Sequence, residues 1–241
     1  MVGLRTRSVG TERMDEEGFS PQVMGEALHR VGGFTRLFGG VRAVRRQLRR
    51  FPEASVLDVG AGDLSLVSSL DQGLANGGPL VGVDSHADVV AVAGQTVSER
   101  PGLHVVRADG RSLPFADRSF DLVISTVTLH HLDDAGAASL LSEMGRVARR
   151  AVFVWDLERS AVALGGALAF AHTIWRKDPL VRYDAPQSVR RAFTASELSR
   201  AAAQAGLRCP RVRRLWPARL ELTALPTHQE GESPSLDRAD P

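Results

Sequence analysis

The sequence is poor in the residues that cross-link a chain or anchor it in a membrane. Its single cysteine, Cys209, excludes a disulfide framework and any multi-thiolate metal site, and we expect no metal. The first 18 residues contain no apolar stretch of the kind a secretory leader needs. The longest apolar run, residues 161–175, is shorter than the roughly 20 residues of a membrane span. These absences favour a cytoplasmic protein without stable membrane insertion.

Lysine is also nearly absent. Lys177 is the only one, so arginine carries almost all of the positive charge. The arginines gather at residues 42–50 and 208–214. Such clusters are typical of the solvated faces of a helix and a strand, but they also line grooves for nucleic acid or anionic membranes. The formal net charge of only +2 does not favour nucleic acid, and we expect none.

Hydrophobic residues make up 43% of the chain, which is enough for a sizeable core. From residue 52 onward, short continuous apolar runs alternate with helical patterns. The expected strands are residues 55–59, 80–84, 104–107, 120–126 and 151–155, and the expected helices are residues 64–74, 87–99 and 135–148. Apolar strands that alternate with helices predict a parallel sheet with both faces covered.

The remaining segments complete the expected domain organisation. The divisions are residues 1–18, a disordered N-terminus; 19–51, a helical cap broken around Gly32-Gly33 and Gly39-Gly40; 52–157, the core; 158–192, a helical lid; 193–224, a closing helix with two strands; and 225–241, a flexible tail. The closing helix is expected at residues 196–205, and its strands at 207–212 and 215–223.

The segment VLDVGAGDLSL, residues 56–66, joins the first apolar run to a Gly-x-Gly turn. Glycines at positions 60 and 62 allow a tight turn and a close approach of the backbone to a ligand. The helix that follows would point its N-terminal amides into the same crevice. This pattern predicts a nucleotide-side loop in a doubly wound α/β domain.

Three acidic residues stand at or near the ends of successive expected strands: Asp58, Asp84 and Asp109. Ligands of open α/β sheets bind outside the carboxyl ends of the strands. Asp84 follows the second strand and is placed to accept hydrogen bonds from ribose hydroxyls. This use is shared by dinucleotides and other adenosine cofactors, so it does not choose among them.

Together these motifs resemble the class I S-adenosylmethionine-dependent methyltransferases. The matching residues are Asp58-Val59-Gly60-Ala61-Gly62, Asp84, Ala108-Asp109, the segment LPFADRSFDLVIS at 113–125, and His130-His131-Leu132. The resemblance covers about residues 52–157. It implies a Rossmann-like fold, with S-adenosyl-L-methionine as cofactor and S-adenosyl-L-homocysteine as product.

The resemblance also implies roles for individual residues. Gly60 and Gly62 would border the methionine part of the cofactor, Asp84 would hold the ribose, and Asp109 would accept from the adenine amino group. The full set of expected cofactor residues is Asp58, Gly60, Ala61, Gly62, Asp63, Asp84, Ser85, Asp109, Gly110 and Ser125.

The glycine turn departs from the family pattern Asp-x-Gly-x-Gly-x-Gly, which often continues with an Asp. Leu64 stands where the third glycine would fall. Deleting two residues from GAGxGD gives the GAGD of this chain, so Asp63 would be that acidic residue in a shortened turn. The shorter turn either weakens cofactor binding or is absorbed at the start of the helix.

His130 and His131 follow the fourth expected strand, where the acceptor of the methyl group should lie. A neutral imidazole there could take a phenolic proton. The structural alternative is that one histidine packs and the other caps the next helix. The sequence lacks the Asn/Asp-Pro-Pro-aromatic signature of enzymes that methylate the exocyclic amines of nucleic-acid bases.

The C-terminal third, about residues 150–222, resembles bacterial small-molecule methyltransferases associated with type III polyketide pathways, including enzymes that O-methylate alkylresorcinols. The matching segments are DLERS at 156–160, DPLVRYD at 178–184 and SVRRAFT at 188–194. An apolar helix over the strand ends could form a lid with room for an alkyl chain. The side chains that could face a phenolic head group are those of His172, Trp175, Tyr183, Asp184 and Arg190.

The sequence therefore predicts an α/β protein with a Rossmann-like, doubly wound, mostly parallel seven-stranded sheet, a helical N-terminal cap and a helical lid after the fifth strand. The expected reaction is O-methylation of a small lipophilic aromatic acceptor, a phenolic polyketide or a quinol. C-methylation of a quinone precursor, RNA methylation and noncatalytic binding of an adenosine cofactor stay open as alternatives. A homodimer also stays open.

Overall fold

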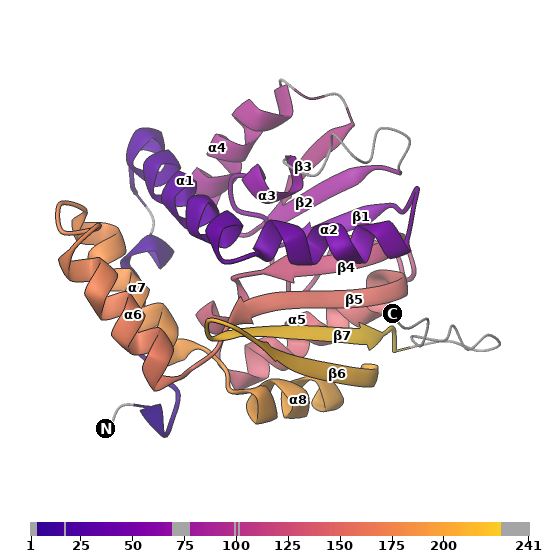
Figure 1. Cartoon of the computed structure of the whole chain (residues 1–241). Coiled ribbons are helices and arrows are strands. Elements are labelled where there is room, and N and C mark those ends of the chain that lie inside the picture. The colour runs from indigo at the N-terminus through magenta and orange to yellow at the C-terminus, as the bar shows by residue number, and fades with distance from the viewer. Residues whose placement is uncertain (1–3, 17, 69–77, 99, 101, 228–241) are drawn as a thin grey trace.

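The computed structural model describes residues 4–16, 18–68, 78–98, 100 and 102–227. A seven-stranded sheet in the order β3-β2-β1-β4-β5-β7-β6 forms its centre (Figure 1). The strands are β1 (Val56–Val59), β2 (Leu80–Asp84), β3 (Leu103–Arg107), β4 (Phe120–Thr126), β5 (Ala148–Leu157), β6 (Arg208–Leu215) and β7 (Arg219–Leu225). β7 runs antiparallel to β5 and β6, and β1 to β5 pair in parallel. The predicted fold class is confirmed.

Helices cover both faces of this sheet, because the central strands are apolar on both sides. Leu57 and Val123 belong to the core under α5 (Asp134–Val147) and α8 (Ala195–Gln204). Their neighbours Val56 and Ile124 belong to the core on the other face. The helices on that face are α2 (Gly40–Arg50), α3 (Ser65–Ser68) and α4 (Ala87–Ser98). Residues 69–74 of the expected third helix lie outside the described residues.

The N-terminal cap is one continuous helix followed by a second. α1 (Pro21–Leu37) runs through Gly32-Gly33 without a break, and α2 starts after Gly39, whose φ is +90°. The expectation of a break at Gly32-Gly33 is therefore wrong. A Cβ at Gly32 would lie 2.7 Å from the Ser65 hydroxyl, so this glycine allows α1 to approach α3 closely.

Residues 158–192 form a helical pair, α6 (Ala161–His172) and α7 (Pro179–Arg191), beside the carboxyl ends of the parallel strands (Figure 1). Hydroxyl and carboxylate side chains cap both helices, since Ser160 accepts from the amide of Ala163 and Asp178 accepts from the amides of Leu180 and Val181. Among the described residues, no helix is both long and apolar enough to cross a membrane.

The N-terminal segment is ordered where the composition predicted disorder. Residues 4–16 include the short 3-10 helix η2 (Arg13–Asp15) and lie along α7. Asp184 of α7 accepts hydrogen bonds from the amides of Arg13 and Met14, and the Ser188 hydroxyl donates to Glu12, which is 3% exposed. Polar side chains thus fix a segment that has little apolar surface of its own. Residues 228–241 of the expected tail lie outside the described residues.

Candidate functional site

A cavity of about 870 Å³ opens at the carboxyl ends of β1, β2 and β4. The order of the sheet reverses here, because the chain continues from β1 to β2 on one side and returns with β4 on the other. Such a switch point leaves a crevice between the loops of an α/β sheet. The glycine turn after β1 lines one part of the cavity. Helices α1, α6 and α7, the segment after β4 and residues 11–15 line other parts.

Leu64 stands where the third glycine of the family pattern would be, and it adopts the same kind of left-handed backbone conformation as the two glycines before it. Gly60, Gly62 and Leu64 all have positive φ values, of 74°, 59° and 62°. A left-handed conformation costs a leucine about 1–2 kcal/mol relative to a glycine. The Leu64 side chain is fully buried and fills the space beside Gly82 of β2, where a Cβ would lie 2.2 Å from a Leu64 methyl carbon. Apolar burial of this side chain therefore offsets its backbone strain.

Replacing Gly82 with alanine should lower the free energy of unfolding by about 1–3 kcal/mol, because the new methyl group overlaps Leu64 and comes within 2.9 Å of the Ala61 Cβ. Urea denaturation measures the change. Gly94→Ala in α4 is the matched control, since a Cβ there meets nothing within 4 Å and alanine favours a helix. Equal stability of the Gly82→Ala variant and the wild type would show that Leu64 does not need this space.

Asp84 sits at the end of β2 with both carboxylate oxygens anchored. One oxygen accepts from the Gly62 amide at 3.1 Å and the other from the His86 amide at 3.0 Å. Each carboxylate oxygen has two lone-pair directions, so both retain acceptor capacity. Asp84 lines the cavity. It therefore ties the glycine turn to β2 and offers the cavity a fixed pair of acceptors.

Asp58, in β1, is a buried carboxylic acid without a hydrogen-bond partner among the described residues. It is 1% exposed, and neither side-chain oxygen is bonded. Burial, together with the nearby charge of Asp84, raises the pKa of Asp58 to about 7. A cation bound beside it would return this pKa toward its ordinary value.

The other expected cofactor residues differ in their surroundings. Asp109 lines the cavity but is exposed, and its two oxygens bind the Arg111 guanidinium at 2.7–3.0 Å. This pairing holds the pKa of Asp109 below its usual range. Asp63 accepts from the Ser65 amide at the start of α3, as expected for the acidic residue of a shortened turn. The expected residues Ala61, Ser85 and Gly110 also line the cavity.

Ser125 does not lie in the cavity, which corrects the expectation that it contacts the cofactor. Its side chain is fully buried within β4, and its hydroxyl donates to the Val59 carbonyl at 2.8 Å. It therefore links β4 to β1. The residues of this segment that reach the cavity are Thr126, Val127 and Thr128.

His130 forms a buried pair with Asp156, a residue that the sequence analysis did not single out. His130 Nδ1 lies 2.7 Å from Asp156 Oδ1, and both side chains are at least nine-tenths buried. Burial opposes ionisation of Asp156, but His130 and the Leu157 amide hold its pKa below the usual range. An ionised carboxylate can only accept, so Nδ1 carries a hydrogen, and in the neutral ring the lone pair is then on Nε2. His130 lines the cavity.

His131 lies in a different network, formed with the N-terminal segment. Its Nδ1 is 2.7 Å from Asp15 and 3.9 Å from Glu12. Burial alone would lower the pKa of His131, but Glu12 and Asp15 outweigh it and raise this pKa to about 9. His131 is therefore protonated at neutral pH and cannot accept a proton there, which corrects the expectation that either histidine could be the base. Arg191 donates to the carbonyls of both histidines and fixes the turn.

The network of His131 predicts a pH-dependent stability. Because the folded pKa of about 9 exceeds the ordinary 6.5, protonated His131 stabilises the fold fully below pH 6.5, and this contribution is lost as the pH rises through 9. The free energy of unfolding should therefore fall more over this range for the wild type than for His131→Gln. Denaturant titrations at a series of pH values measure both. Parallel pH profiles of the two proteins would contradict the assigned charge.

A cluster of aromatic side chains forms part of the cavity wall. Phe34 of α1 packs on Trp175 and on Phe170 of α6, with ring centroids 4.4 and 5.6 Å apart. Phe38 extends this cluster at 5.7 Å from Phe34. All four rings line the cavity, and Trp175 is placed where the sequence predicted. The part of the cavity that these four rings line is suited to an apolar, ring-containing ligand.

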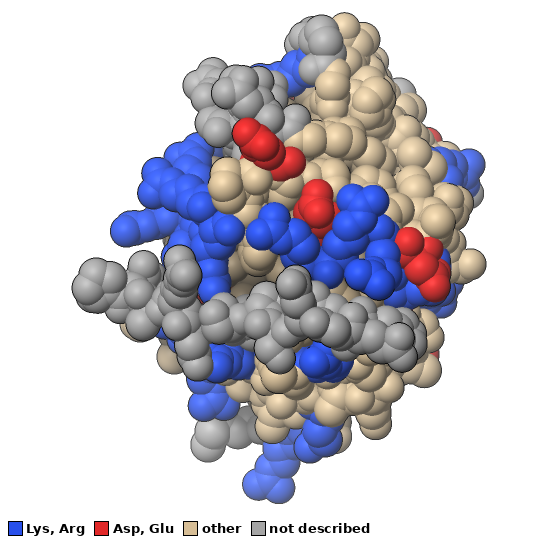
Figure 2. Space-filling model, turned by 90° about the vertical axis from the view of Figure 1, so that its right-hand side faces the viewer, with Lys and Arg blue, Asp and Glu red and all other residues tan. Residues whose placement is uncertain are grey.

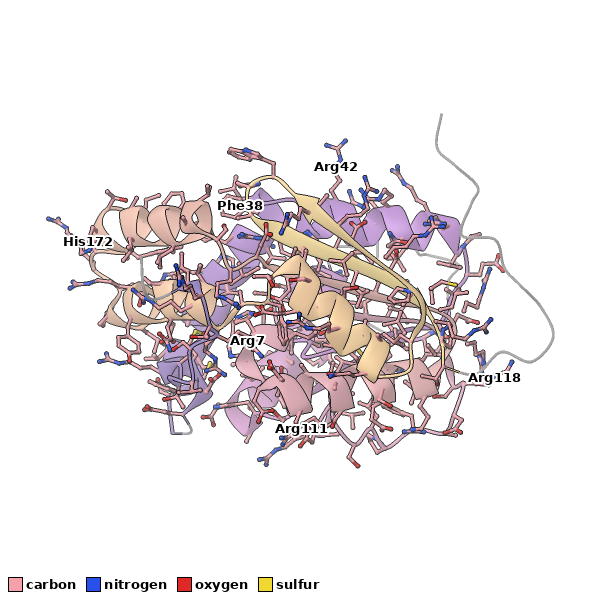
Figure 3. All side chains as sticks on the ribbon, turned by 90° about the horizontal axis from the view of Figure 1, so that it is seen from below. Arg7, Phe38, Arg42, Arg111, Arg118 and His172 are labelled. Carbon is pink, nitrogen blue, oxygen red and sulfur yellow. The ribbon has the colours of Figure 1, made fainter. Side chains whose placement is uncertain are left out.

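Three expected acceptor residues lie outside the cavity. His172 is exposed at the outer end of α6 (Figure 3). Tyr183 is 49% exposed and lies under the Arg13 guanidinium, while Arg190 does not line the cavity. Helical geometry explains why Tyr183 and Arg190 lie outside the cavity. Val181, Asp184 and Ser188 face the cavity, and since successive residues are rotated by about 100° around the helix axis, positions 183 and 190 point to the other side. Asp184 does line the cavity, as expected.

Among the described residues, Glu12, His130 and His131 could together hold a metal ion, since their ligand atoms lie within 4.8 Å of one another. The sequence analysis expected no metal. Glu12 could not be connected with these histidines from the sequence, because 118 positions separate it from His130 and only the fold of the N-terminal segment brings them together. Protonated His131 already supplies a positive charge to this acidic surrounding.

Residues 56–151 match the family model of a methyltransferase domain. A demethylmenaquinone methyltransferase of Staphylococcus epidermidis is 30% identical to the chain over 111 residues, which are 46% of this chain and 45% of that protein. The similarity to this curated relative therefore spans about half of either protein. The residues matched by the family model include the glycine turn, Asp84, Asp109 and both histidines.

Solved structures share the fold over a larger part of the chain. A SAM-dependent methyltransferase from Aquifex aeolicus has a TM-score of 0.63 at 19% identity, with 86% of this chain and 98% of that chain covered. Human N-acetylserotonin methyltransferase, solved in complex with SAM, has a TM-score of 0.63 at 16% identity, with 87% and 57% covered. At such identities the likeness supports the architecture and leaves the reaction to the site itself.

Proposed function

With residues 56–151 taken as a methyltransferase domain, we propose that this protein transfers a methyl group from S-adenosylmethionine to a phenolic oxygen of a lipophilic acceptor, such as an alkylresorcinol or a quinol. The observation that carries the proposal is one cavity that is lined by the glycine turn, Asp84, His130 and the aromatic cluster around Phe34.

The residues at the glycine turn suit this cofactor. Asp58, just before the turn, does not line the cavity, but it is a buried carboxyl group without a partner among the described residues, so its charge would favour the positively charged amino group of a methionine moiety nearby. Asp84 presents two anchored acceptors for ribose hydroxyls. When bound, the cofactor supplies an electrophilic methyl group on a sulfonium. The chain's own contribution is to position the acceptor and to remove its proton.

His130 is the base in this proposal. Asp156 accepts from Nδ1 and holds the ring in the tautomer whose Nε2 can take a proton. As the phenolic O–H bond breaks, the proton would pass to Nε2 and the oxygen's electron pair would form the new bond to the methyl carbon. The carbon–sulfur bond would break at the same time, with its electron pair left on the sulfur of S-adenosylhomocysteine. The resulting imidazolium is stabilised by the ionised Asp156 beside it. His131 is already protonated and contributes a fixed positive charge near the developing phenolate.

C-methylation of a quinone precursor is the second candidate, because the similar Staphylococcus epidermidis protein is named a demethylmenaquinone methyltransferase. The same base could deprotonate a hydroquinone, and the ring carbon of the phenolate would then attack the methyl group as its bond to sulfur breaks. Loss of the proton from that ring carbon to solvent would restore the aromatic ring. NMR of the product from methyl-labelled cofactor and an alkylated phenol or hydroquinone distinguishes the two. An oxygen-bound methyl signal supports O-methylation, whereas a ring-methyl signal contradicts it.

The shape of the cavity gives a prediction about the acceptor. Gly166 of α6 lines the cavity, and a Cβ there would meet nothing within 4 Å. Gly166→Leu should therefore place a side chain in the cavity and lower kcat/KM for an alkylated phenol about tenfold or more, while S-adenosylhomocysteine binding is retained. The matched control is Gly165→Leu, because Gly165 is exposed, equally free of neighbours and outside the cavity. Equal losses in both variants would mean that α6 does not border the acceptor.

A further inference from the structure

The outer surface of α6 has a composition that the proposed reaction does not require. The helix contains no acidic or basic residue before His172, and Ala171 is the buried residue among its twelve. A helix that is apolar all round is normally buried in a protein core or in a membrane. Here Val162 is 67% exposed and Leu168 is 38% exposed, and Ile174 just beyond the helix is 66% exposed.

The tip of the β6–β7 hairpin extends this apolar surface. Trp216, at the tip, is 87% exposed, yet it lines the cavity together with Val162. These two residues therefore lie at the rim of the cavity. Leu37, at the end of α1, is 72% exposed and precedes Phe38, whose ring lies 4.6 Å from the Arg219 guanidinium of the same hairpin. Exposed apolar residues clustered around a cavity mouth indicate an interaction surface.

Arginines of α2 lie beside this apolar surface. Arg42, Arg46 and Arg49 follow one exposed side of the helix at i, i+4 and i+7. Figures 1 and 3 agree in placing α6, the hairpin tip and α2 along the same side of the molecule. Figure 2 shows that basic side chains continue over the adjoining face, toward which α2 runs. The apolar rim thus has a basic border.

The register of the sheet adds two arginines of β6 to the same side. Arg46 of α2 binds Glu221 of β7, so Glu221 points to the α2 face of the sheet. Arg213 pairs with Glu221 across the ladder, and Arg211 pairs with the position two residues further along β7. Directly paired residues of an antiparallel ladder project on the same face. Both arginines therefore project on the face that α2 covers.

We propose that α6, the tip of the β6–β7 hairpin and the arginine side of α2 form a peripheral docking surface for an anionic lipid bilayer. Tryptophan prefers the boundary between headgroups and acyl chains, aliphatic side chains enter the acyl region, and arginine binds phosphate. The delivery of a lipophilic acceptor from the bilayer into the cavity rests on the proposed function. The docking itself rests on the surface alone.

Other occupants fit this surface less well. RNA could use Trp216 and the arginines for stacking and phosphate contacts, but the uncharged aliphatic helix α6 would offer it neither. A second copy of the chain would have to cover Val162 and Trp216, which lie at the rim of the cavity. A bilayer uses the apolar helix and the arginines at once, and it presents a lipophilic molecule at the cavity mouth.

Vesicle flotation tests the proposal with the full chain. The protein should float with vesicles of phosphatidylcholine and phosphatidylglycerol, and not with phosphatidylcholine alone. Trp216→Ala combined with Val162→Glu should abolish flotation, with circular dichroism to confirm folding. Val9→Glu is the matched control, since Val9 is 99% exposed on the N-terminal segment and should not matter.

The charged part of the surface is tested separately. Arg42→Gln should weaken partition into anionic vesicles about fivefold, as expected for one basic residue near the membrane surface. Arg118→Gln is its control, because Arg118 is exposed at the far end of the sheet from α6 (Figure 3). Equal effects of the two substitutions would contradict docking through α2.

Several results would overturn the docking proposal. The first is a failure to float with anionic vesicles, or equal flotation with neutral ones. The second is undiminished flotation of the variant with both Trp216 and Val162 replaced. RNA that competes with vesicles for the protein, or a dimer in solution that shields Trp216 fluorescence, would identify another occupant of the surface. Calorimetry with S-adenosylhomocysteine in the absence of vesicles separates this proposal from the proposed function. A protein that binds S-adenosylhomocysteine but does not float contradicts the docking alone, and the reverse result contradicts the cofactor assignment alone.

Discussion

Replacing His130 with asparagine should lower kcat for a phenolic acceptor by about 10²–10⁴-fold, the usual contribution of a positioned general base. The asparagine amide can still donate to Asp156, so the buried carboxylate keeps a partner. What the variant loses is the Nε2 lone pair that takes the phenolic proton. S-adenosylhomocysteine affinity, measured by calorimetry, should stay within about twofold of wild type because His130 is not needed to hold the cofactor.

Two further variants separate catalysis from packing. Asp156→Asn should also lower kcat strongly, because an amide that donates to Nδ1 forces the proton onto Nε2. His172→Asn, at an exposed histidine outside the cavity, should leave turnover unchanged. If His130→Asn reduced turnover and cofactor affinity equally, His130 would be a packing residue and the proposed base would be wrong.

Replacing Asp84 with alanine should raise the dissociation constant of S-adenosylhomocysteine by about 100-fold or more. The variant loses hydrogen bonds from ribose hydroxyls to a charged acceptor, each contributing about 1.5–3 kcal/mol. It also loses the carboxylate that binds the Gly62 and His86 amides and orders the glycine turn. Titration calorimetry gives the dissociation constant, and a thermal melt shows whether the variant is folded.

Asp84→Asn and Asp109→Ala are the matched comparisons for this prediction. The asparagine side chain keeps one acceptor oxygen, so the Asp84→Asn variant should lose less affinity than the alanine variant. Asp109→Ala should have a smaller effect, because Asp109 is exposed and its oxygens already bind Arg111. An Asp84→Ala protein with wild-type affinity would show that the ribose is held elsewhere.

The sequence was sufficient for the sheet and for the glycine turn that lines the cavity, because both depend on local patterns. β2 and β4 begin and end where the apolar runs predicted, and the closing helix carries the capping box of Thr194 and Glu197. Residues 56–151, which contain the motifs that indicated a methyltransferase, match the family model of a methyltransferase domain. The glycine turn, Asp84 and Asp109 are close in sequence to the strand ends that position them.

The part of the cavity around His130 and α6 was harder to predict because it is built by contacts between distant segments. Asp156 meets His130 only because β4 and β5 are neighbours, although an acidic residue at a strand end was a usable signal. The charge of His131 depends on Glu12 and Asp15, whose polar segment resembles a disordered one. Trp175 and Tyr183 are equally plausible from the sequence, and only the packing of α6 and α7 turns one inward and the other outward.

Calorimetric titration of the purified wild-type chain with S-adenosylhomocysteine tests the central claim most directly. The shortened glycine turn, with Leu64 in the left-handed conformation and Asp84 bonded to the Gly62 amide, should form a complete cofactor site. The account predicts saturable binding at one site per chain. Absence of saturable heat from a protein shown to be folded would contradict it.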